Sequence, residues 1–320
     1  MSTLAETALS IGINPEKLPA CPILGKWYYL PALGKPKTNT ACRARALAHG
    51  VVYLCNHVTG DTVTWFSDDL PQDPEALAKL KKQAEYAQYQ AKRDQEKRYE
   101  KASIDAKNII TNYCTQANPN HPYLLAKGLK PTKHLYQQLN ELVIPVYDAE
   151  RFEYPRIQSL QFIGVKGNKR FLRGGKMAYG SYWDNNNFHR SKIEAMNARN
   201  VPTYNGHDDI IISEGWATSQ SLAQQWGVKG WHISAFNAGN LKKVALAIGK
   251  KYPRAAIIIA ADNDQTGIKA AKEACFLVNG VLHMPEFTDH ERETYKSATD
   301  WNDRYLIDKG LMPLQKKGAE

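Results

Sequence analysis

The last third of the chain alternates short apolar runs with longer amphipathic segments. The runs have the lengths of strands and the segments those of helices, in the order strand 210–213, helix 216–226, strand 230–234, helix 241–252, strand 256–261 and a helix from Thr266. Strands that alternate with helices form right-handed βαβ units and a parallel sheet. This part of the chain therefore predicts an α/β domain.

Upstream, between residue 121 and about residue 200, short strands alternate with turns. Residues 142–148 form an apolar strand pattern, and residues 157–163 alternate polar and apolar positions as a half-buried strand does. The run Lys166-Gly167-Asn168 predicts a tight turn into a further short strand at 169–172. We expect a mixed α+β subdomain here.

Residues 1–70 are rich in aromatic and β-branched positions separated by turn residues. Strand patterns at 51–57 and 62–66 flank the turn Thr59-Gly60-Asp61, which predicts a hairpin. Asp73 and Pro74 then have the positions of an N-cap and a first helical residue. Good helix formers continue to about residue 116 without proline or glycine, so a long charged helix follows the small β module.

The expected fold class is α/β, with a parallel sheet flanked by helices. A mixed α+β subdomain precedes this sheet, and a small β-rich N-terminal module is joined to it by the long helix. The expected boundaries are a β-rich module at 1–70, the helical linker at 71–118, the mixed subdomain at 119–205, the α/β domain at 206–310 and a tail at 311–320.

The charge balance is strongly basic. Among 320 residues, 42 are Lys or Arg and 32 are Asp or Glu, which gives a formal net charge of +10. Such a balance favours a polyanionic partner, and nucleic acid is the first candidate. The alternative is a basic soluble protein that binds no polyanion, and charge alone leaves it open.

The five cysteines are scattered and include no CxxC pair. This argues against a zinc ribbon or a disulfide framework and fits a reducing cytoplasm. Cys42, Cys55 and His57 could share a metal, although their spacing is poor for it. The first residues lack the pattern of a signal peptide, and no apolar run has membrane-spanning length. We expect a soluble cytoplasmic protein without a membrane partner.

Three carboxylates follow two of the predicted parallel strands. Glu214 comes directly after the strand at 210–213, and Asp262 and Asp264 follow the strand at 256–261. The carboxyl ends of neighbouring parallel strands meet at one sheet edge, where ligands bind. Carboxylate oxygens suit Mg²⁺, or Mn²⁺ in its place, better than they suit zinc. The alternative is that these acids only cap the helices that follow them.

The same residues resemble a known domain. Glu214-Gly215 and the run Asp262-x-Asp264-x-x-Gly267 resemble the toprim domain shared by bacterial DnaG-type primases, topoisomerases and some nucleases. The segment 298–303 is similar to the third acidic segment of the plasmid and phage primases. Residues 144–148, 159–163 and 167–175 are similar to the basic subdomain of those primases, so the resemblance extends over roughly residues 119–310.

The resemblance implies a DNA primase that joins ribonucleoside triphosphates into short RNA primers on single-stranded DNA, in replication of a phage, plasmid or other mobile element. It implies that Glu214, Asp262 and Asp264 are catalytic and bind the metal, with Asp300 and Asp303 as weaker candidates. It also implies a basic surface that binds triphosphate or template, made of Lys169, Arg170, Arg173, Lys176, Gly174 and Gly175. Taken alone, these basic residues would be an ordinary exposed hairpin.

The sequence also departs from that family. The N-terminal region lacks the zinc ligands with which DnaG-type primases begin, so its β module, with Arg43, Arg45 and Trp65, is a candidate template reader. No GxxxxGK[ST] loop occurs, and a separate replicative helicase is expected as a partner. A toprim nuclease and a non-catalytic DNA-binding replisome adaptor are the alternative functions. A topoisomerase would need a larger strand-passage domain.

Overall fold

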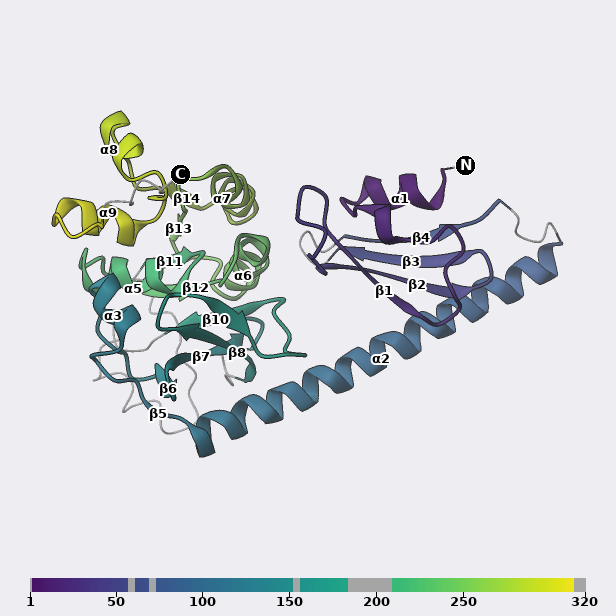
Figure 1. The fold of residues 1–320 in the computed structure, drawn as a ribbon, viewed down its shortest axis with the longest axis horizontal. Helices are drawn as coiled ribbons and strands as arrows, with labels where there is room; N and C mark the ends of the chain where they lie inside the picture. The colour runs from purple at the N-terminus through teal and green to yellow at the C-terminus, as the bar shows by residue number, and fades with distance from the viewer. Residues whose placement is uncertain (1, 57–60, 69–72, 152–155, 184–208, 314–320) are drawn as a thin grey trace, which may run out of the picture. The chain divides into compact units, whose positions relative to one another are not determined.

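A computed structural model describes residues 2–56, 61–68, 73–151, 156–183 and 209–313 (Figure 1). The chain forms two compact units, residues 1–97 and 98–320, and the division falls within the helix α2 (Pro74–Tyr113). No helix in the described ranges is long and apolar enough to cross a membrane.

The N-terminal unit is built on a four-stranded antiparallel sheet. Its strands follow the chain in the order β1 (Trp27–Leu30), β2 (Cys42–Ala48), β3 (Val51–Asn56) and β4 (Thr62–Phe66). The two strands of the predicted hairpin are confirmed, whereas its turn at Thr59-Gly60 lies outside the described residues. One face of the sheet carries the core, under the helix α1 (Leu4–Ser10).

Helix α1 and the strands β1 and β2 were not expected from the sequence, in which Arg43 and Arg45 were interpreted as part of a basic loop. Thr3 and Glu6 close a capping box at the start of α1, with Glu6 N donating to Thr3 Oγ1 and Thr3 N donating to the Glu6 carboxylate. The same Thr-x-x-Glu spacing is visible in the sequence and could have predicted the helix. A short 3-10 helix, Pro15–Lys17, follows it.

Cys42 and Cys55 occupy neighbouring strands without sharing a face. Cys42 pairs with Asn56 and Cys55 with Arg43, so the side chains of the two cysteines point to opposite faces of the sheet. Cys42 belongs to the core under α1. The structure therefore does not support a metal held jointly by these two thiols, and His57 lies outside the described residues.

The predicted long helix is confirmed as α2, and Asp73 caps it by accepting a hydrogen bond from Ala76 N at 2.9 Å. Within each unit one stripe of α2 is buried. Ala84 packs with Leu47 and Val51 in the N-terminal unit, and Ala106 packs with Phe162 in the second unit. Small side chains permit this close packing, so the helix is more than a solvated linker. It ends at Tyr113, and after Cys114 the residues Thr115–Gln116 form strand β5.

The second unit begins with an antiparallel region. It contains β5, the helix α3 (Pro122–Lys127) and the strands β6 (Tyr136–Gln138), β7 (Glu141–Asp148), β8 (Ile157–Gly164), β9 (Lys169–Phe171) and β10 (Gly180–Trp183). The predicted strands at 142–148, 157–163 and 169–172 are confirmed. The half-buried environment expected for β8 is wrong: its polar residues Gln158, Ser159 and Gln161 are buried. Helix α2 packs against Leu160 and Phe162 of β8, and Gly175 packs against Ser159.

The predicted α/β region follows, with all of its expected strands and helices. Its strands β11 (Ile210–Ser213), β12 (Trp231–Ser234), β13 (Ile257–Ala260) and β14 (Val281–His283) are parallel, in the order β14-β13-β11-β12. The helices are α5 (Trp216–Gln224), α6 (Ala238–Lys251), α7 (Gln265–Val278), α8 (Asp289–Thr294) and α9 (Trp301–Asp308).

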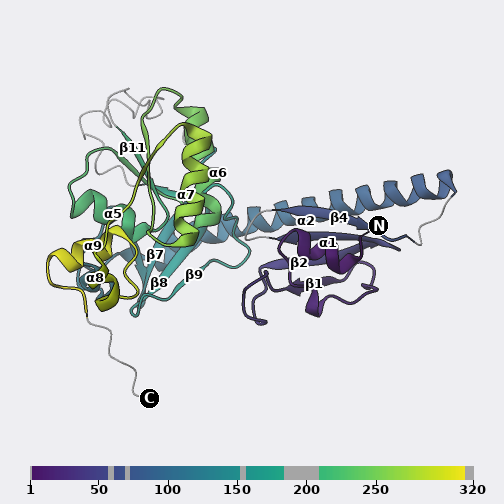
Figure 2. The same cartoon turned by 90° about the horizontal axis from the view of Figure 1, so that it is seen from above.

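Helices cover both faces of this parallel sheet (Figures 1 and 2). On one face, Val244 and Ile248 of α6 and Ala271 of α7 pack against the isoleucines of β11 and β13. On the other face, Leu222 of α5 and Trp301 of α9 form a smaller cluster with strand residues. The central strands β11 and β13 each contain three consecutive isoleucines because both of their faces are covered.

Strand β10 joins the two regions of the second unit into one sheet of ten strands. It pairs antiparallel with β12 through Tyr182 and Ser234, and antiparallel with β7 through Gly180 and Asp148. Residues on both sides of the expected boundary at 205/206 thus share one hydrogen-bonded sheet. The basic hairpin β8–β9 and the acidic strand ends are therefore parts of the same compact unit.

Candidate metal centre and basic hairpin

The three predicted acids lie at the carboxyl edge of the parallel sheet. Ser213 of β11 pairs with Ala260 of β13, so Glu214 and Asp262 leave the sheet at the same edge. Asp264 caps α7 and accepts a hydrogen bond from Gly267 N at 2.7 Å. A Cβ at Gly267 would lie 2.7 Å from the backbone oxygen of Asp262, which explains the glycine in this motif.

A fourth acid, Asp300, joins them from the start of α9. Its Oδ1 accepts a hydrogen bond from Asp303 N at 2.8 Å, and its Oδ2 accepts one from Thr218 Oγ1 at 3.4 Å. Asn263 N donates to Thr299 O at 2.7 Å, which ties the loop between Asp262 and Asp264 to the segment that carries Asp300. The third acidic segment is thereby held beside the other two.

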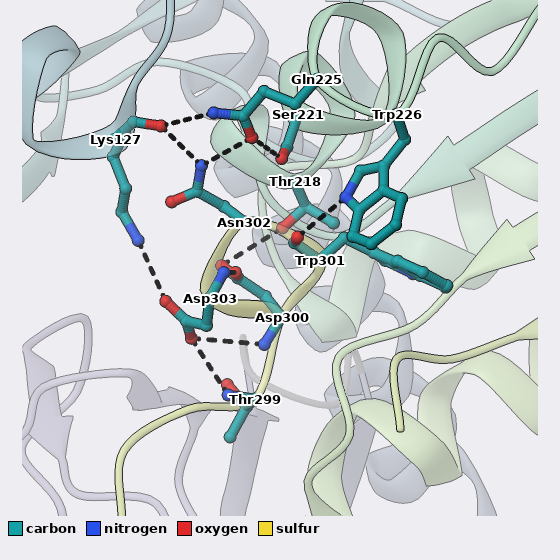
Figure 3. Close-up of polar contacts among 10 residues, drawn as sticks. All are labelled: Lys127, Thr218, Ser221, Gln225, Trp226, Thr299, Asp300, Trp301, Asn302 and Asp303. Atoms are coloured by element: carbon teal, nitrogen blue, oxygen red, sulfur yellow. Dashed lines mark hydrogen bonds and ion pairs between the residues drawn. The ribbon is translucent and has the colours of Figure 1, made fainter. Parts of the chain in front are cut away.

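A polar network holds the start of α9 against α3 and α5 (Figure 3). The backbone oxygen of Lys127 accepts hydrogen bonds from Gln225 Nε2 and Asn302 Nδ2, each at 2.8 Å. Lys127 Nζ lies 3.3 Å from Asp303 Oδ1, and Asp303 Oδ2 accepts a hydrogen bond from Thr299 N at 3.0 Å. Both oxygens of Asp303 are thus engaged in positioning the segment, whereas Asp300 interacts electrostatically with Asp262.

The acids perturb one another strongly. Burial, followed by the charges of Asp300, Glu214 and Asp264, raises the pKa of Asp262 to about 8. Burial is also the main cause that raises the pKa of Glu214, with a contribution from the charge of Asp264. Burial and the charge of Asp303 raise the pKa of Asp300. The cluster thus concentrates more negative charge than its own surroundings neutralise.

The chemistry of this cluster fits a hard divalent cation. Asp262 Oδ1 is buried and has no hydrogen-bond partner among the described residues. A cation would satisfy this oxygen and offset the repulsion between the carboxylates, and oxygen-only donors are those that Mg²⁺ and Mn²⁺ prefer. Within the described ranges no three acidic, histidine or cysteine side chains already form a metal-binding group. Shared coordination would therefore require the side chains to turn toward one another.

Among the predicted basic residues, Lys169 is the one whose charge acts on the acids. It begins β9, pairs with Ile163 of β8 across the hairpin and is exposed. Its charge lowers the pKa values of Asp262, Glu214 and Asp300, against the larger effect of burial. The hairpin therefore brings one cation close to the acidic cluster.

The other basic side chains have different surroundings. Arg170 forms two contacts with the carboxylate of Glu141 and lies 3.9 Å from the ring centroid of Phe162. Lys176 Nζ lies 3.9 Å from Asp148 Oδ2, and Arg173 is exposed. The predicted cluster is thus spread over several environments, and its charge is partly neutralised by neighbouring acids.

Local backbone conformation and packing explain why glycine occurs at the two predicted positions, 174 and 175. Gly174 has a φ of 81°, which a residue with a side chain rarely adopts. A Cβ at Gly175 would lie 2.1 Å from Ser159 Oγ, so the segment after β9 could not pack against β8 with a larger residue. Both glycines therefore shape the segment that follows the basic hairpin.

Comparison with known proteins agrees with this architecture. Residues 209–310 match the toprim domain family, which is the domain that the acidic motifs resemble. Over 256 residues, or 76% of the chain, it is 28% identical to a DNA primase TraC of Escherichia coli, and it is 26% identical to a second Escherichia coli DNA primase TraC over 254 residues. The resemblance to plasmid primases is thus confirmed.

These relatives are much longer than this chain, which spans 16% and 22% of their lengths. A solved structure, the primase fragment of the bacteriophage T7 primase-helicase protein, matches with a TM-score of 0.38 and 15% sequence identity. The match covers 63% of this chain and 73% of the T7 fragment.

Proposed function

We propose that this chain is a DNA primase that makes short RNA primers on single-stranded DNA by metal-dependent nucleotidyl transfer. The observation that carries the proposal is the acidic cluster of the toprim domain, with a buried Asp262 oxygen that lacks a hydrogen-bond partner. Similarity to the two TraC primases over 76% of the chain supports it. A role in replication of a phage, plasmid or other mobile element belongs to the same proposal.

In this proposal a ribonucleotide 3′-hydroxyl attacks the α-phosphate of the next nucleoside triphosphate, and pyrophosphate leaves. Asp262 and Asp264 would hold the divalent cation, Mg²⁺ or Mn²⁺, and Asp300 would add negative charge beside Asp262. The cation would stabilise the charge that gathers on the phosphate oxygens. Glu214 would either bind the metal as well or accept the proton of the hydroxyl. Its raised pKa makes it a stronger base than an ordinary glutamate.

The basic hairpin supplies positive charge on the substrate side of this site. Lys169 interacts electrostatically with the acids and is exposed, so it could contact a triphosphate bound beside the acidic cluster. Arg173, which follows β9, is exposed and could contact the same phosphates or the template. Arg170 and Lys176 would do so only by leaving their acidic neighbours Glu141 and Asp148. A separate helicase stays a prediction.

A priming assay tests the proposal with labelled ribonucleoside triphosphates, single-stranded DNA and Mg²⁺, with and without EDTA. The wild-type chain should make short RNA products that EDTA abolishes. The substitution Asp262→Asn should reduce their yield at least about 100-fold, because loss of one preorganised charge at a transition state commonly costs that much. The matched control is Asp289→Asn, which removes an exposed acid at the start of α8 and should leave the yield unchanged.

Other outcomes of the assay point to the alternatives. Degraded DNA in place of RNA products would indicate a toprim nuclease that uses the same acids for hydrolysis. If neither activity is observed while DNA binding persists, the chain would be a replisome adaptor or a primase that is silent without its helicase. Wild-type primer yield from Asp262→Asn would contradict the assignment of the metal to this cluster.

A further inference from the structure

The face of the N-terminal sheet opposite the α1 core carries paired aromatic and basic side chains. Trp27 of β1 is directly opposite Arg45 of β2, and Tyr29 is directly opposite Arg43. Alternation along each strand places these four side chains on one face. Their neighbours Leu30 and Ala44 point the other way into the core. We name Trp27, Tyr29, Arg43 and Arg45 the aromatic-arginine face.

Each arginine of this face is held against a ring. The guanidinium of Arg45 lies 5.4 Å from the ring centroid of Trp27, and that of Arg43 lies 5.4 Å from the ring centroid of Tyr29. Arg45 Nε also donates to Gly25 O at 3.0 Å. Neither guanidinium forms an ion pair with a carboxylate among the described residues, and Tyr29 is 54% exposed. Both cations are therefore positioned without being neutralised.

The segment of chain that carries this face contains basic residues and no acidic ones. Between Glu16 and Asp61 the sequence contains no acidic residue, and its basic residues are Lys17, Lys26, Lys35, Lys37, Arg43 and Arg45. One of them, Lys37, pairs with Glu16 at 2.5 Å. Outside that pair, a polyanion would meet cations and rings and no carboxylate from this stretch of chain.

The rest of the unit limits the extent of this face. Helix α2 covers the part of the sheet formed by β3 and β4. There Ala84 packs with Val51, and Gln88 Nε2 donates a hydrogen bond to Thr64 Oγ1 at 2.8 Å. Trp65, which the sequence suggested as a template contact, belongs to the opposite face. Its ring packs on the α1 core and its Nε1 donates to Ser2 O at 2.8 Å. Trp27 and Tyr29 are thus the aromatic residues of this face that lie against its two arginines.

We infer that the aromatic-arginine face binds single-stranded DNA, with bases stacked on Trp27 and Tyr29 and phosphates contacted by Arg43 and Arg45. Every base offers a flat surface to an aromatic ring, and the cations follow the backbone. Residues i and i+2 of one strand are about 7 Å apart, which leaves one base for each ring. In a duplex the bases already stack on one another, so the face should discriminate against double strands.

The inference rests on the proposed function only for the role of this strand as the priming template. Binding itself does not involve the acidic cluster of the second unit. The two proposals can therefore fail separately, and a binding measurement distinguishes them.

Fluorescence anisotropy with the full chain and a labelled thymidine oligonucleotide measures the binding. The double substitution of Trp27→Leu and Tyr29→Leu should weaken it at least about tenfold, since stacking contributes about 1–3 kcal/mol per base. The double substitution of Arg43→Ala and Arg45→Ala should reduce the slope of log K against log salt by about 1 to 2, since two fewer phosphates are neutralised. Double-stranded DNA of the same length should compete poorly.

Matched variants separate this surface from general charge and fold. Replacing both Arg43 and Arg45 by Lys keeps the charge and should restore the salt slope. Replacing the exposed Lys269 and Lys272 of α7 by Ala removes two charges elsewhere and should leave oligonucleotide affinity within about twofold. Circular dichroism melting verifies that each variant folds, and Asp262→Asn should bind as the wild type does.

Photo-crosslinking gives a readout that other DNA-binding surfaces do not mask. An oligonucleotide that carries 5-iododeoxyuridine should crosslink to the tryptic peptide that begins at Trp27, and the Leu double variant should lose this product. Crosslinks confined to other peptides, or unchanged affinity in the folded Leu double variant, would overturn the inference. In that case a wild-type chain that still makes primers would leave the proposed function intact.

Discussion

The carboxyl group of Asp262 has a buried oxygen without a hydrogen-bond partner, and its neighbours are acidic. Both features disfavour its ionised form in the absence of a cation. Its pKa is raised from its ordinary value of 3.8 to about 8. The folded chain therefore binds more protons than the unfolded chain between these two pH values. The contribution of Asp262 to stability then falls as pH rises through this window.

Asp262→Asn should therefore stabilise the metal-free chain at high pH. In EDTA at pH 8 we expect the variant to melt several degrees above the wild type, because about 1 kcal/mol changes Tm by about 2–4 °C in a unit of this size. The difference should shrink toward pH 4, where Asp262 is protonated in the wild type. Added Mg²⁺ should raise the Tm of the wild type more than that of the variant. Equal melting temperatures at pH 8 in EDTA would show that Asp262 is not strained by its neighbours.

Strand β10 depends on one buried amide for its attachment to α6. Asn240 Nδ2 donates to Gly180 O at 2.6 Å and to Ala235 O at 2.9 Å, and its Oδ1 accepts a hydrogen bond from Tyr179 N at 2.8 Å. All three bonds are made by a side chain that is 4% exposed. Asn240 thus links the first turn of α6 to the strand that joins the parallel and antiparallel regions.

Asn240→Ala should lower the free energy of unfolding of the second unit by about 2–4 kcal/mol, since three backbone groups lose a buried partner. Urea unfolding followed by circular dichroism measures this change. The matched control is Asn237→Ala, which removes only the N-cap of α6, where Asn237 Oδ1 accepts a hydrogen bond from Asn240 N at 3.0 Å. The cap should contribute about 1 kcal/mol. An equal loss in the two variants would assign Asn240 no role beyond the helix start.

Residues 98–320 form one unit because the sheet is continuous through β10. Trp183 of β10 packs edge-on against Trp231 of β12, with ring centroids 6.2 Å apart, and belongs to the core of the parallel sheet. Removal of β10 would expose the edge of β12 and part of this core. An unpaired strand edge with exposed apolar groups favours aggregation.

A fragment of residues 98–320 should therefore unfold in a single cooperative transition, whereas a fragment of residues 206–310 should melt at a lower temperature or aggregate. Thermal circular dichroism and size-exclusion chromatography of the two fragments measure this difference. The expected domain boundary at 205/206 predicts the opposite result. A monomeric 206–310 fragment that melts cooperatively at the temperature of the longer fragment would support that boundary.

The parts of the fold that sequence predicted well are those that depend on local pattern. The apolar runs at 210–213 and 256–261 are strands, and the acids that follow them meet at one edge because parallel strands share their direction. The long α2 was equally visible from its composition. The burial of the polar residues of β8 was not visible from the sequence. It depends on α2, which is distant in sequence, and on the irregular segment after β9.

By itself, the amino-acid sequence determined the kind of chemistry available: a toprim acid set, a basic hairpin and a basic N-terminal module. The tertiary structure decided which members of each set act together. It brought Asp300 and Lys169 to Asp262 and paired Arg170 with Glu141. It also placed Trp27 and Tyr29 with the arginines, whereas Trp65 packs against the α1 core on the opposite face. Residue types and spacings are local, whereas strand register and side-chain direction arise only from pairing between distant segments.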